Sequence, residues 1–144
     1  MKKRAVTLLL CLVPLAFLLM LALSKSLNAM MMGDSSAITL GVNLNVVRNL
    51  LIVVTALLTA SSVAVSGCIG FVGLVIPHMV RSVVGPDHRK LIPISTLTGA
   101  IFLIWVDVGA RMIKPPAELP IGILTAFLGA PLFLWMIRVR RYEF

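Results

Sequence analysis

Residues 67–90 read GCIGFVGLVIPHMVRSVVGPDHRK, and this stretch decides the fold. It begins with Gly67, Gly70 and Gly73, and each glycine weakens a helix interior by about 1 kcal/mol relative to alanine. Backbone that is not helical survives at membrane depth only where protein buries it or where it lines a cavity. We therefore expect a broken, protein-buried segment that leads into a short membrane helix at about 74–84, which contains Pro77.

The chain as a whole is strongly apolar. Of its 144 residues, 60% are hydrophobic and 12% are charged, and the mean hydropathy is +1.08. A soluble domain is usually about 25% charged, so this composition indicates an integral membrane protein. The formal net charge is +8. Most of the basic side chains flank apolar runs, which is typical of membrane orientation and argues against binding of nucleic acid.

Four apolar runs are long enough to cross a bilayer as helices, because a helix rises 1.5 Å per residue and about 20 residues span the hydrocarbon. With the short helix they predict an all-α, polytopic helical bundle. The whole chain, residues 1–144, is expected to form a single transmembrane domain with several spans. The expected full spans are 5–23, 49–66, 91–113 and 121–137, and the short helix is 74–84. The run at 5–23 has a cleaved signal peptide as its alternative, but it is longer than the usual apolar region of such a peptide.

Residues 25–48 are polar by the standard of this chain and are expected to connect the first two spans. Asp34 or Ser35 can cap a short helix through 37–40, because a side-chain oxygen can accept a hydrogen bond from an unpaired amide. Gly41 can end that helix in the left-handed conformation. Two interpretations stay open from the residues alone, a surface loop and a docking site for a partner protein.

The third full span contains Asp107 and Arg111, four residues apart and in the order that favours a helical ion pair. Ionisable residues inside a span usually face protein or water, but a pair that reaches out to the membrane interface is an equal alternative. Three prolines between 115 and 120 then interrupt the helix. In the last span, Ala126 and Ala130 form a pair of small residues that favours close helix packing.

We find no pattern of residues for catalysis or for cofactor binding. The chain has no Walker A sequence, so it is not expected to hold the phosphates of ATP. The spacing of Gly67, Gly70 and Gly73 differs from the dinucleotide-binding pattern. His78 and His88 lack further metal ligands at a useful spacing. We expect that the chain is not an enzyme, binds no cofactor and has no metal site.

Several segments together resemble a known family, the FecCD-type permease subunits of ATP-binding cassette (ABC) importers for iron–siderophores, haem and cobalamin. The likeness extends over nearly the whole chain in order, and the segments that carry it are 27–41, 67–81, 87–89, 107–111, 118–122 and 129–131. It implies a permease with ten spans per subunit that works as a homodimer or with a paralogue. Two ATPase subunits would dock inside and a substrate-binding protein outside.

Within that family the chain resembles the C-terminal portion, with the sixth to tenth spans. The first five spans are absent from it, so a fragment, a truncated product and half of a split permease are all open, with the missing N-terminal half as a further partner. The implied function is ATP-driven uptake of an iron(III)–siderophore-type chelate, with cobalamin or haem as alternative substrates. The implied location is the bacterial inner (plasma) membrane, with membrane lipid around the spans and the C-terminus in the cytoplasm.

The resemblance also implies roles for particular residues. Segment 32–44 is similar to two short coupling helices, and the residues that would contact the ATPase are Met32, Gly33, Asp34, Ser35, Ser36, Ala37, Leu40 and Gly41. The cytoplasmic turn of Asp87, His88 and Arg89 would lie on the same face. Arg111 and Lys114 would contact the binding protein. The residues that would flank the translocation path or the dimer interface are Gly67, Gly70, Gly73 and Pro77.

Overall fold

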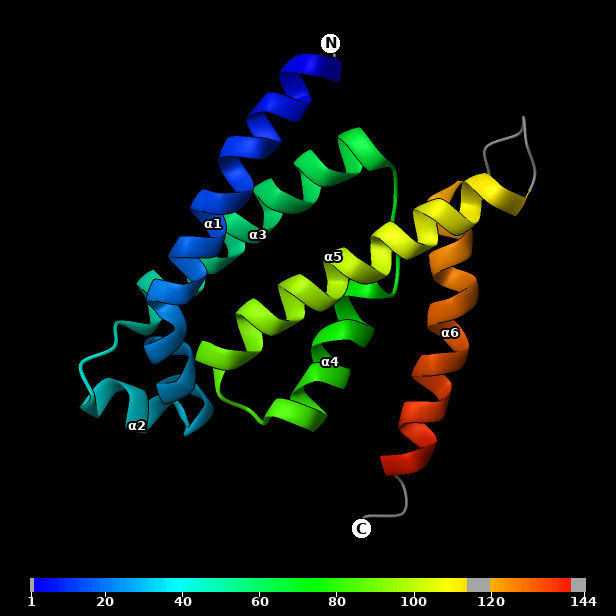
Figure 1. Ribbon diagram of the computed structural model, residues 1–144. Coiled ribbons are helices and arrows are strands. Elements are labelled where there is room, and N and C mark those ends of the chain that lie inside the picture. The colour runs from blue at the N-terminus through cyan, green and yellow to red at the C-terminus, as the bar shows by residue number, and fades with distance from the viewer. Residues whose placement is uncertain (1, 114–119, 141–144) are drawn as a thin grey trace. The chain divides into compact units, whose positions relative to one another are not determined.

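The computed structural model describes residues 2–113 and 120–140, with side chains described for 3–113 and 120–139. These residues form helices and no strand (Figure 1), which confirms the expected all-α fold. The helices are α1 (Lys2–Met31), α2 (Asp34–Thr39), α3 (Leu44–Ser66), α4 (Val72–Val84), α5 (His88–Ile113) and α6 (Ile121–Arg140). Of these, α1, α3, α5 and α6 are long and apolar enough to cross a membrane, whereas α4 is shorter.

The helices α1 and α3 extend beyond the expected spans. Helix α1 continues past residue 23 to Met31, and α3 begins at Leu44 rather than near 49. The apolar pattern ends before 24–31, but none of those residues is glycine or proline, so nothing there breaks the helix. At the start of α3, the Asn43 side-chain oxygen accepts a hydrogen bond from the Val46 amide at 3.3 Å. The connection between α1 and α3 is therefore 32–43, shorter than the expected 25–48.

The chain divides into two compact units. Unit 1 consists of residues 1–65 and 84–92, and holds α1, α2, nearly all of α3 and the first turn of α5. Unit 2 consists of residues 66–83 and 93–144, and holds nearly all of α4, the rest of α5 and α6. The chain passes from one unit to the other beside Gly67, Gly85 and Pro93.

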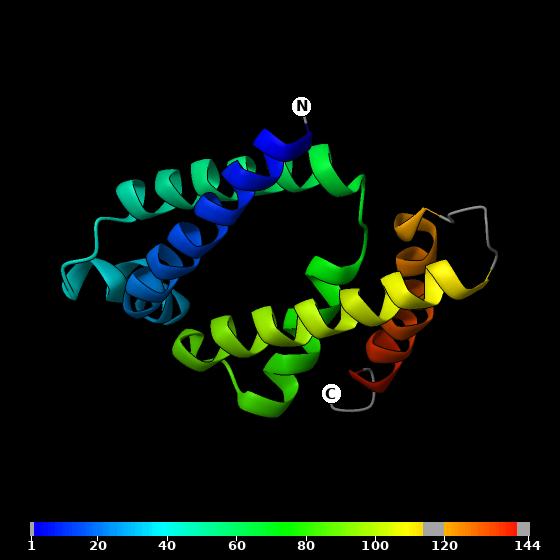
Figure 2. The ribbon, with the colours of Figure 1, turned by 45° about the horizontal axis from the view of Figure 1, so that its top comes forward.

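In unit 1, the short helix α2 lies beside the C-terminal end of α1, at the end where α3 begins (Figures 1 and 2). Small side chains make this packing possible. Ala29 of α1, Ala37 of α2 and Val47 of α3 are all buried, and Ala37 has no exposed surface. The buried Ser24 hydroxyl is satisfied within α1, because it donates to the Leu21 carbonyl oxygen at 2.6 Å. The connection 32–43 is thus held at both of its ends.

In unit 2, residues 67–71 are not helical, which confirms the expected break between a long helix and a short one. The expected burial of this segment was wrong for the described residues, because Gly67, Cys68 and Phe71 are exposed. Gly67 has φ 76° and Phe71 has φ 65°, a left-handed conformation that is uncommon for a residue with a side chain. The expected break included Gly73, and this was wrong, because Gly73 lies inside α4. Helix α4 begins at Val72, where the Val75 amide donates to the Phe71 carbonyl oxygen at 2.8 Å. Helix formation therefore resumes before the third glycine.

The broken segment packs against one face of α6. A Cβ atom added to Gly122 would collide with the Cys68 carbonyl oxygen. A Cβ atom added to Gly129 would lie 2.6 Å from the Phe71 Cβ atom, far inside van der Waals contact. Thr125 lies between these glycines, is fully buried, and donates its hydroxyl to the Gly122 carbonyl oxygen at 3.0 Å. We name Gly122, Thr125 and Gly129 the α6 notch; it holds Cys68 and Phe71.

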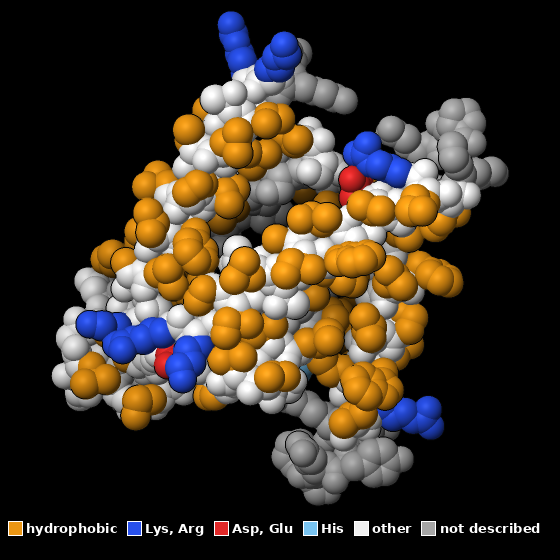
Figure 3. Space-filling model, viewed as in Figure 1, with side chains coloured by type: hydrophobic (Ala, Val, Ile, Leu, Met, Phe, Trp, Pro, Cys, Tyr) orange, Lys and Arg blue, Asp and Glu red, His pale blue; other side chains and the backbone are white. Residues whose placement is uncertain are grey.

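Apolar side chains remain exposed along the long helices. Figure 3 shows them over the visible faces of α1 and α5, with Lys and Arg side chains near helix ends. Leu8, Ile52, Trp105 and Phe127 are among those exposed. Because polar surfaces would be disfavoured in a bilayer, these apolar faces fit helices that are surrounded by lipid or by further spans.

Candidate functional site

The connection 32–43 has a defined conformation that its two glycines set. Gly33 has φ 105° and precedes α2, and Gly41 has φ 82° and follows it. At the end of α2, the Gly41 amide donates to the Ile38 carbonyl oxygen at 2.9 Å, and the Val42 amide donates to the Ala37 carbonyl oxygen at 3.0 Å. This pair of bonds is the Schellman motif, and it confirms the left-handed cap expected at Gly41.

The expected cap at the start of α2 was wrong. The helix begins at Asp34 with Gly33 at the cap position, and no side chain accepts a hydrogen bond from the first amides. The Asp34 carboxylate instead accepts from the Arg48 guanidinium, with Nη2 2.9 Å from Oδ1 and 2.8 Å from Oδ2. Arg48 lies on α3, so the ion pair ties α2 to the next long helix. The expected pair of short helices in 32–44 is also absent, since only α2 precedes the start of α3.

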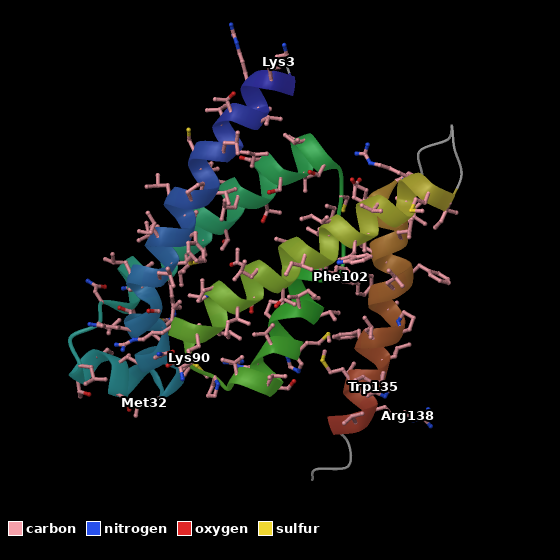
Figure 4. The ribbon with its side chains drawn as sticks, in the orientation of Figure 1. Lys3, Met32, Lys90, Phe102, Trp135 and Arg138 are labelled. Carbon is pink, nitrogen blue, oxygen red and sulfur yellow. The ribbon has the colours of Figure 1, made fainter. Side chains whose placement is uncertain are left out.

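The outer surface of this connection is apolar. Met32 is 73% exposed, and Ile38 and Leu40 are also exposed, whereas Ala37 faces inward. Figure 4 shows Met32 at the end of unit 1 that carries α2. We name Met32, Ile38 and Leu40 the apolar knob. Exposed apolar side chains on a firmly held segment between two long helices are typical of a protein-binding surface.

A groove of about 440 Å³ lies on the α1–α3 side of the connection. Its walls come from the end of α1, from the turn after α2 and from the start of α3, and they are Lys25, Ser26, Ala29, Leu40, Gly41, Val42, Asn43, Val46 and Val47. Sequence reasoning did not anticipate this groove. It depends on the helical course of residues 25–31, which the polar composition had assigned to a loop.

The turn before α5 is joined to the end of α1. The Asn28 side chain donates from Nδ2 to the Asp87 carboxylate oxygen Oδ1 at 2.7 Å. The same carboxylate oxygen accepts from the Arg89 amide at 3.0 Å and so caps α5. The hydrogen bond from Asn28 and then that from Arg89 lower the pKa of Asp87 below its ordinary value, because both favour the ionised carboxylate.

His88 completes this junction. Its amide nitrogen lies 2.9 Å from Asn28 Oδ1 and its ring Nδ1 lies 2.8 Å from the same oxygen. A carbonyl oxygen only accepts hydrogen bonds, so Nδ1 carries a proton here. Figure 4 shows Lys90, in the first turn of α5, at the same end of unit 1 as Met32. The structure thus brings the predicted coupling residues and the predicted cytoplasmic turn to one end of unit 1.

Arg111 forms the expected ion pair within α5, where its Nε lies 3.0 Å from Asp107 Oδ2. The Arg111 side chain is 67% exposed and that of Asp107 is 35% exposed. Lys114, the other residue expected to contact a binding protein, lies outside the described residues. Contact of either residue with a binding protein stays a prediction.

Unit 2 contains an apolar cavity of about 150 Å³ next to the broken segment. It lies among α4, α5 and α6, and Phe71, Val75, Phe102, Thr125 and Gly129 are among its walls. Figure 4 shows Phe102 on α5. The role of Gly67, Gly70 and Pro77 beside a transport path stays a prediction. Over 2–113 and 120–140, no three His, Cys, Asp or Glu side chains lie close enough together to hold a metal ion.

Comparison with known proteins assigns the chain to a family. Residues 1–139 match the model of the FecCD transport family. The Fe(3+) dicitrate transport system permease protein FecD of Escherichia coli is 43% identical over 135 residues, which are 94% of this chain and 41% of that protein. The hemin transport system permease protein HmuU of Yersinia pestis is 45% identical, over 83% of this chain and 36% of that protein.

A solved structure gives the same result. It is described as an inward-facing conformation of an ABC transporter of metal-chelate type, and it matches with a TM-score of 0.87 and 39% identity over 94% of this chain and 44% of its own. The chain therefore spans less than half the length of the relatives that it matches. The fold, the extent of the family match and the similarity to these permeases agree, and the chain belongs to the FecCD transport family.

Proposed function

We propose that this chain forms the C-terminal portion of an importer permease that takes up an iron(III)–siderophore-type chelate, with ATP hydrolysed on a separate subunit. The relatives are permease proteins of import systems for ferric dicitrate, hemin and cobalamin, and this supports a bulky chelate as the substrate. Iron chelates are the substrate class that we favour, and haem and cobalamin are the alternatives.

The observation that carries the proposal is the apolar knob on a rigid connection between two helices that can span a membrane. We propose that Met32, Ile38 and Leu40 enter a cleft on the ATPase subunit. Closure of the ATPase pair would then displace α2. Because α2 is packed on α1 through Ala37 and tied to α3 through the Asp34–Arg48 pair, the displacement would pass to both long helices.

We also propose an orientation in the membrane. The connection 32–43, the turn before α5 and the C-terminus lie in the cytoplasm of a bacterial cell, and the Asp107–Arg111 pair lies near the outer surface. Arg111 and Lys114 would there meet a substrate-binding protein. In a permease of the relatives' length, the N-terminal spans and a second permease subunit would complete the transport path.

Charged substitutions in the knob test the proposal. In a complete permease that contains this sequence, Met32→Glu with Leu40→Glu should abolish uptake and co-purification of the ATPase, because carboxylates would be forced into an apolar cleft. Both side chains are exposed, so the fold should persist. Thr7→Val, an exposed site in the N-terminal part of α1, is the matched control. Undiminished uptake by the double variant would contradict the proposal.

Side-specific labelling tests the orientation. With Cys11 and Cys68 replaced, the exposed Ser35→Cys should react with a membrane-impermeant thiol reagent in inside-out vesicles and not in intact cells. Addition of the ATPase subunit should protect it. Reaction from outside the cell would refute a cytoplasmic connection. Competition among ferric siderophore, ferric dicitrate, haem and cobalamin for uptake then identifies the substrate class.

A further inference from the structure

One side chain, that of Asn28, joins the end of α1 to the turn before α5 through several hydrogen bonds. Asn28 donates to Asp87 Oδ1 at 2.7 Å and accepts from the His88 amide at 2.9 Å and from His88 Nδ1 at 2.8 Å. These residues belong to unit 1 and are 59 and 60 positions apart in the chain. We name Asn28, Asp87 and His88 the amide clamp.

The clamp joins two structural elements at their ends. On one side, Asn28 is followed by Ala29 and Met30, whose carbonyl oxygens accept from the amides of Met32 and Gly33 at 3.1 and 3.2 Å. On the other side, Asp87 immediately precedes α5, and its carbonyl oxygen accepts from the amides of Lys90 and Leu91 at 3.1 and 2.9 Å. The Asn28 amide group therefore links the residue stretch before the connection 32–43 to the first turn of α5.

Among side chains of this length, only that of asparagine can make all of these hydrogen bonds. The carboxylate of Asp87 requires a donor and the His88 amide requires an acceptor, and a primary amide supplies both on one planar group. An aspartate at position 28 would place two carboxylates within hydrogen-bond distance of each other. A leucine of similar volume would leave Asp87 and His88 without these partners.

We propose that Asn28 is a positioning residue that transmits movement of the α2 connection to α5. This inference rests on the proposed function. When a partner displaces α2, the clamp holds the first turn of α5 to the end of α1, so that the two move together. Without the clamp, α2 moves with its partner while α5 stays behind, and ATP is hydrolysed without uptake.

A reciprocal exchange tests this role. Asn28→Asp alone opposes two carboxylates, and the number of chelates imported per ATP hydrolysed should fall about ten-fold, the loss expected when a hydrogen bond to a charged group is broken. In Asn28→Asp with Asp87→Asn, the new carboxylate accepts from His88 and from the new amide. The hydrogen bond from Arg89 is given up, because the NH2 group takes the place of the oxygen that accepts both bonds in the wild type. This double variant should restore most of the coupling. Thr7→Val in α1 is again the control.

The measurement uses the complete permease with its ATPase in proteoliposomes, and records ATP hydrolysis, chelate uptake and ATPase co-purification for each variant. A coupling ratio for Asn28→Asp equal to that of the control, with the ATPase still bound, would overturn the clamp. So would an exchange variant that assembles but stays uncoupled, or a loss of assembly in both variants, which would reduce Asn28 to a folding role.

A distance measurement separates this proposal from the proposed function. Spin labels at the exposed positions Ser35 and Lys90, both in unit 1, should keep one distance throughout the ATP cycle. In Asn28→Leu the distribution should broaden on addition of ATP. An unchanged distribution in Asn28→Leu would overturn the clamp while leaving the apolar knob intact. Uptake that survives charged substitutions in the knob would instead refute the proposed function itself.

Discussion

Replacing Gly129 by alanine should destabilise unit 2, although alanine is the better helix former. Alanine in a helix interior gains about 1 kcal/mol over glycine. The added Cβ would lie 2.6 Å from Phe71 Cβ and 3.3 Å from Phe71 Cγ, so either α6 or the broken segment must move. Overpacking of this kind costs about 1–3 kcal/mol. The net effect should be a loss of up to about 2 kcal/mol.

A matched substitution isolates the steric term. Gly109 lies in the helix α5 of the same unit, and a Cβ added there meets no atom within 4 Å. Gly109→Ala should therefore keep the helical gain without the clash. The difference in unfolding free energy between the two variants should be about 1–3 kcal/mol, measured as equilibrium unfolding of the permease in mixed detergent micelles.

Removal of the opposing atom gives the refuting result. In Phe71→Gly the Cβ and ring are gone, and the nearest remaining atom to the added Cβ is the former Phe71 Cα at 3.9 Å, an ordinary contact. Gly129→Ala should then cost no more in this background than Gly109→Ala does. The contrary result is that Gly129→Ala lowers the unfolding free energy as much with glycine at position 71 as with phenylalanine. That result would show that contact with Phe71 is not what requires glycine at position 129.

Two further predictions concern unit 1. The lowered pKa of Asp87 means that the ionised carboxylate stabilises the folded state above its ordinary pKa of 3.8, and that this contribution is lost as the pH falls below that value. The stability difference between wild type and Asp87→Asn should therefore shrink on acidification, and a difference that grows would contradict the junction with Asn28. Arg48→Gln should change the unfolding free energy by less than about 1 kcal/mol, because the Arg48 and Asp34 side chains are 49% and 57% exposed. A loss of several kcal/mol in a urea titration would show that the pair is more than a surface contact.

Element types could be predicted from the sequence, because length and apolar composition decide whether a helix can cross a bilayer. The limits of α1 could not, since Lys25 and Asn28 end the apolar pattern without ending the helix. The prediction that Asp34 caps α2 was wrong because of a contact between two helices. A carboxylate near a helix start can accept from local amides or from a distant guanidinium, and Arg48 on α3 takes it.

The candidate site was predicted in part. Gly41 marked the end of α2, because it occupies a conformation that favours glycine. Gly33 was not recognised as the residue before α2, since that position had been assigned to Asp34 or Ser35. Asn28 carried no such signal, since its partners lie 59 and 60 positions away. The α6 notch had a weak signal in the spacing of Gly122, Thr125 and Gly129 on one helix face. Close packing was predicted at Ala126 and Ala130 instead. In the structure, the broken segment comes closest to α6 at Gly122 and Gly129.

The notch has a consequence for the order in which the protein is assembled. The broken segment leaves backbone amides and carbonyls outside any helix, and in hydrocarbon each such group that lacks a partner is unfavourable by several kcal/mol. The surface that receives Cys68 and Phe71 is on α6, which is synthesised after α4 and α5. Until α6 is present, the backbone groups of this segment therefore need other hydrogen-bond partners, from the insertion machinery or from water. Its docking can occur only after α6 has been synthesised, and a side chain at position 122 or 129 would obstruct it.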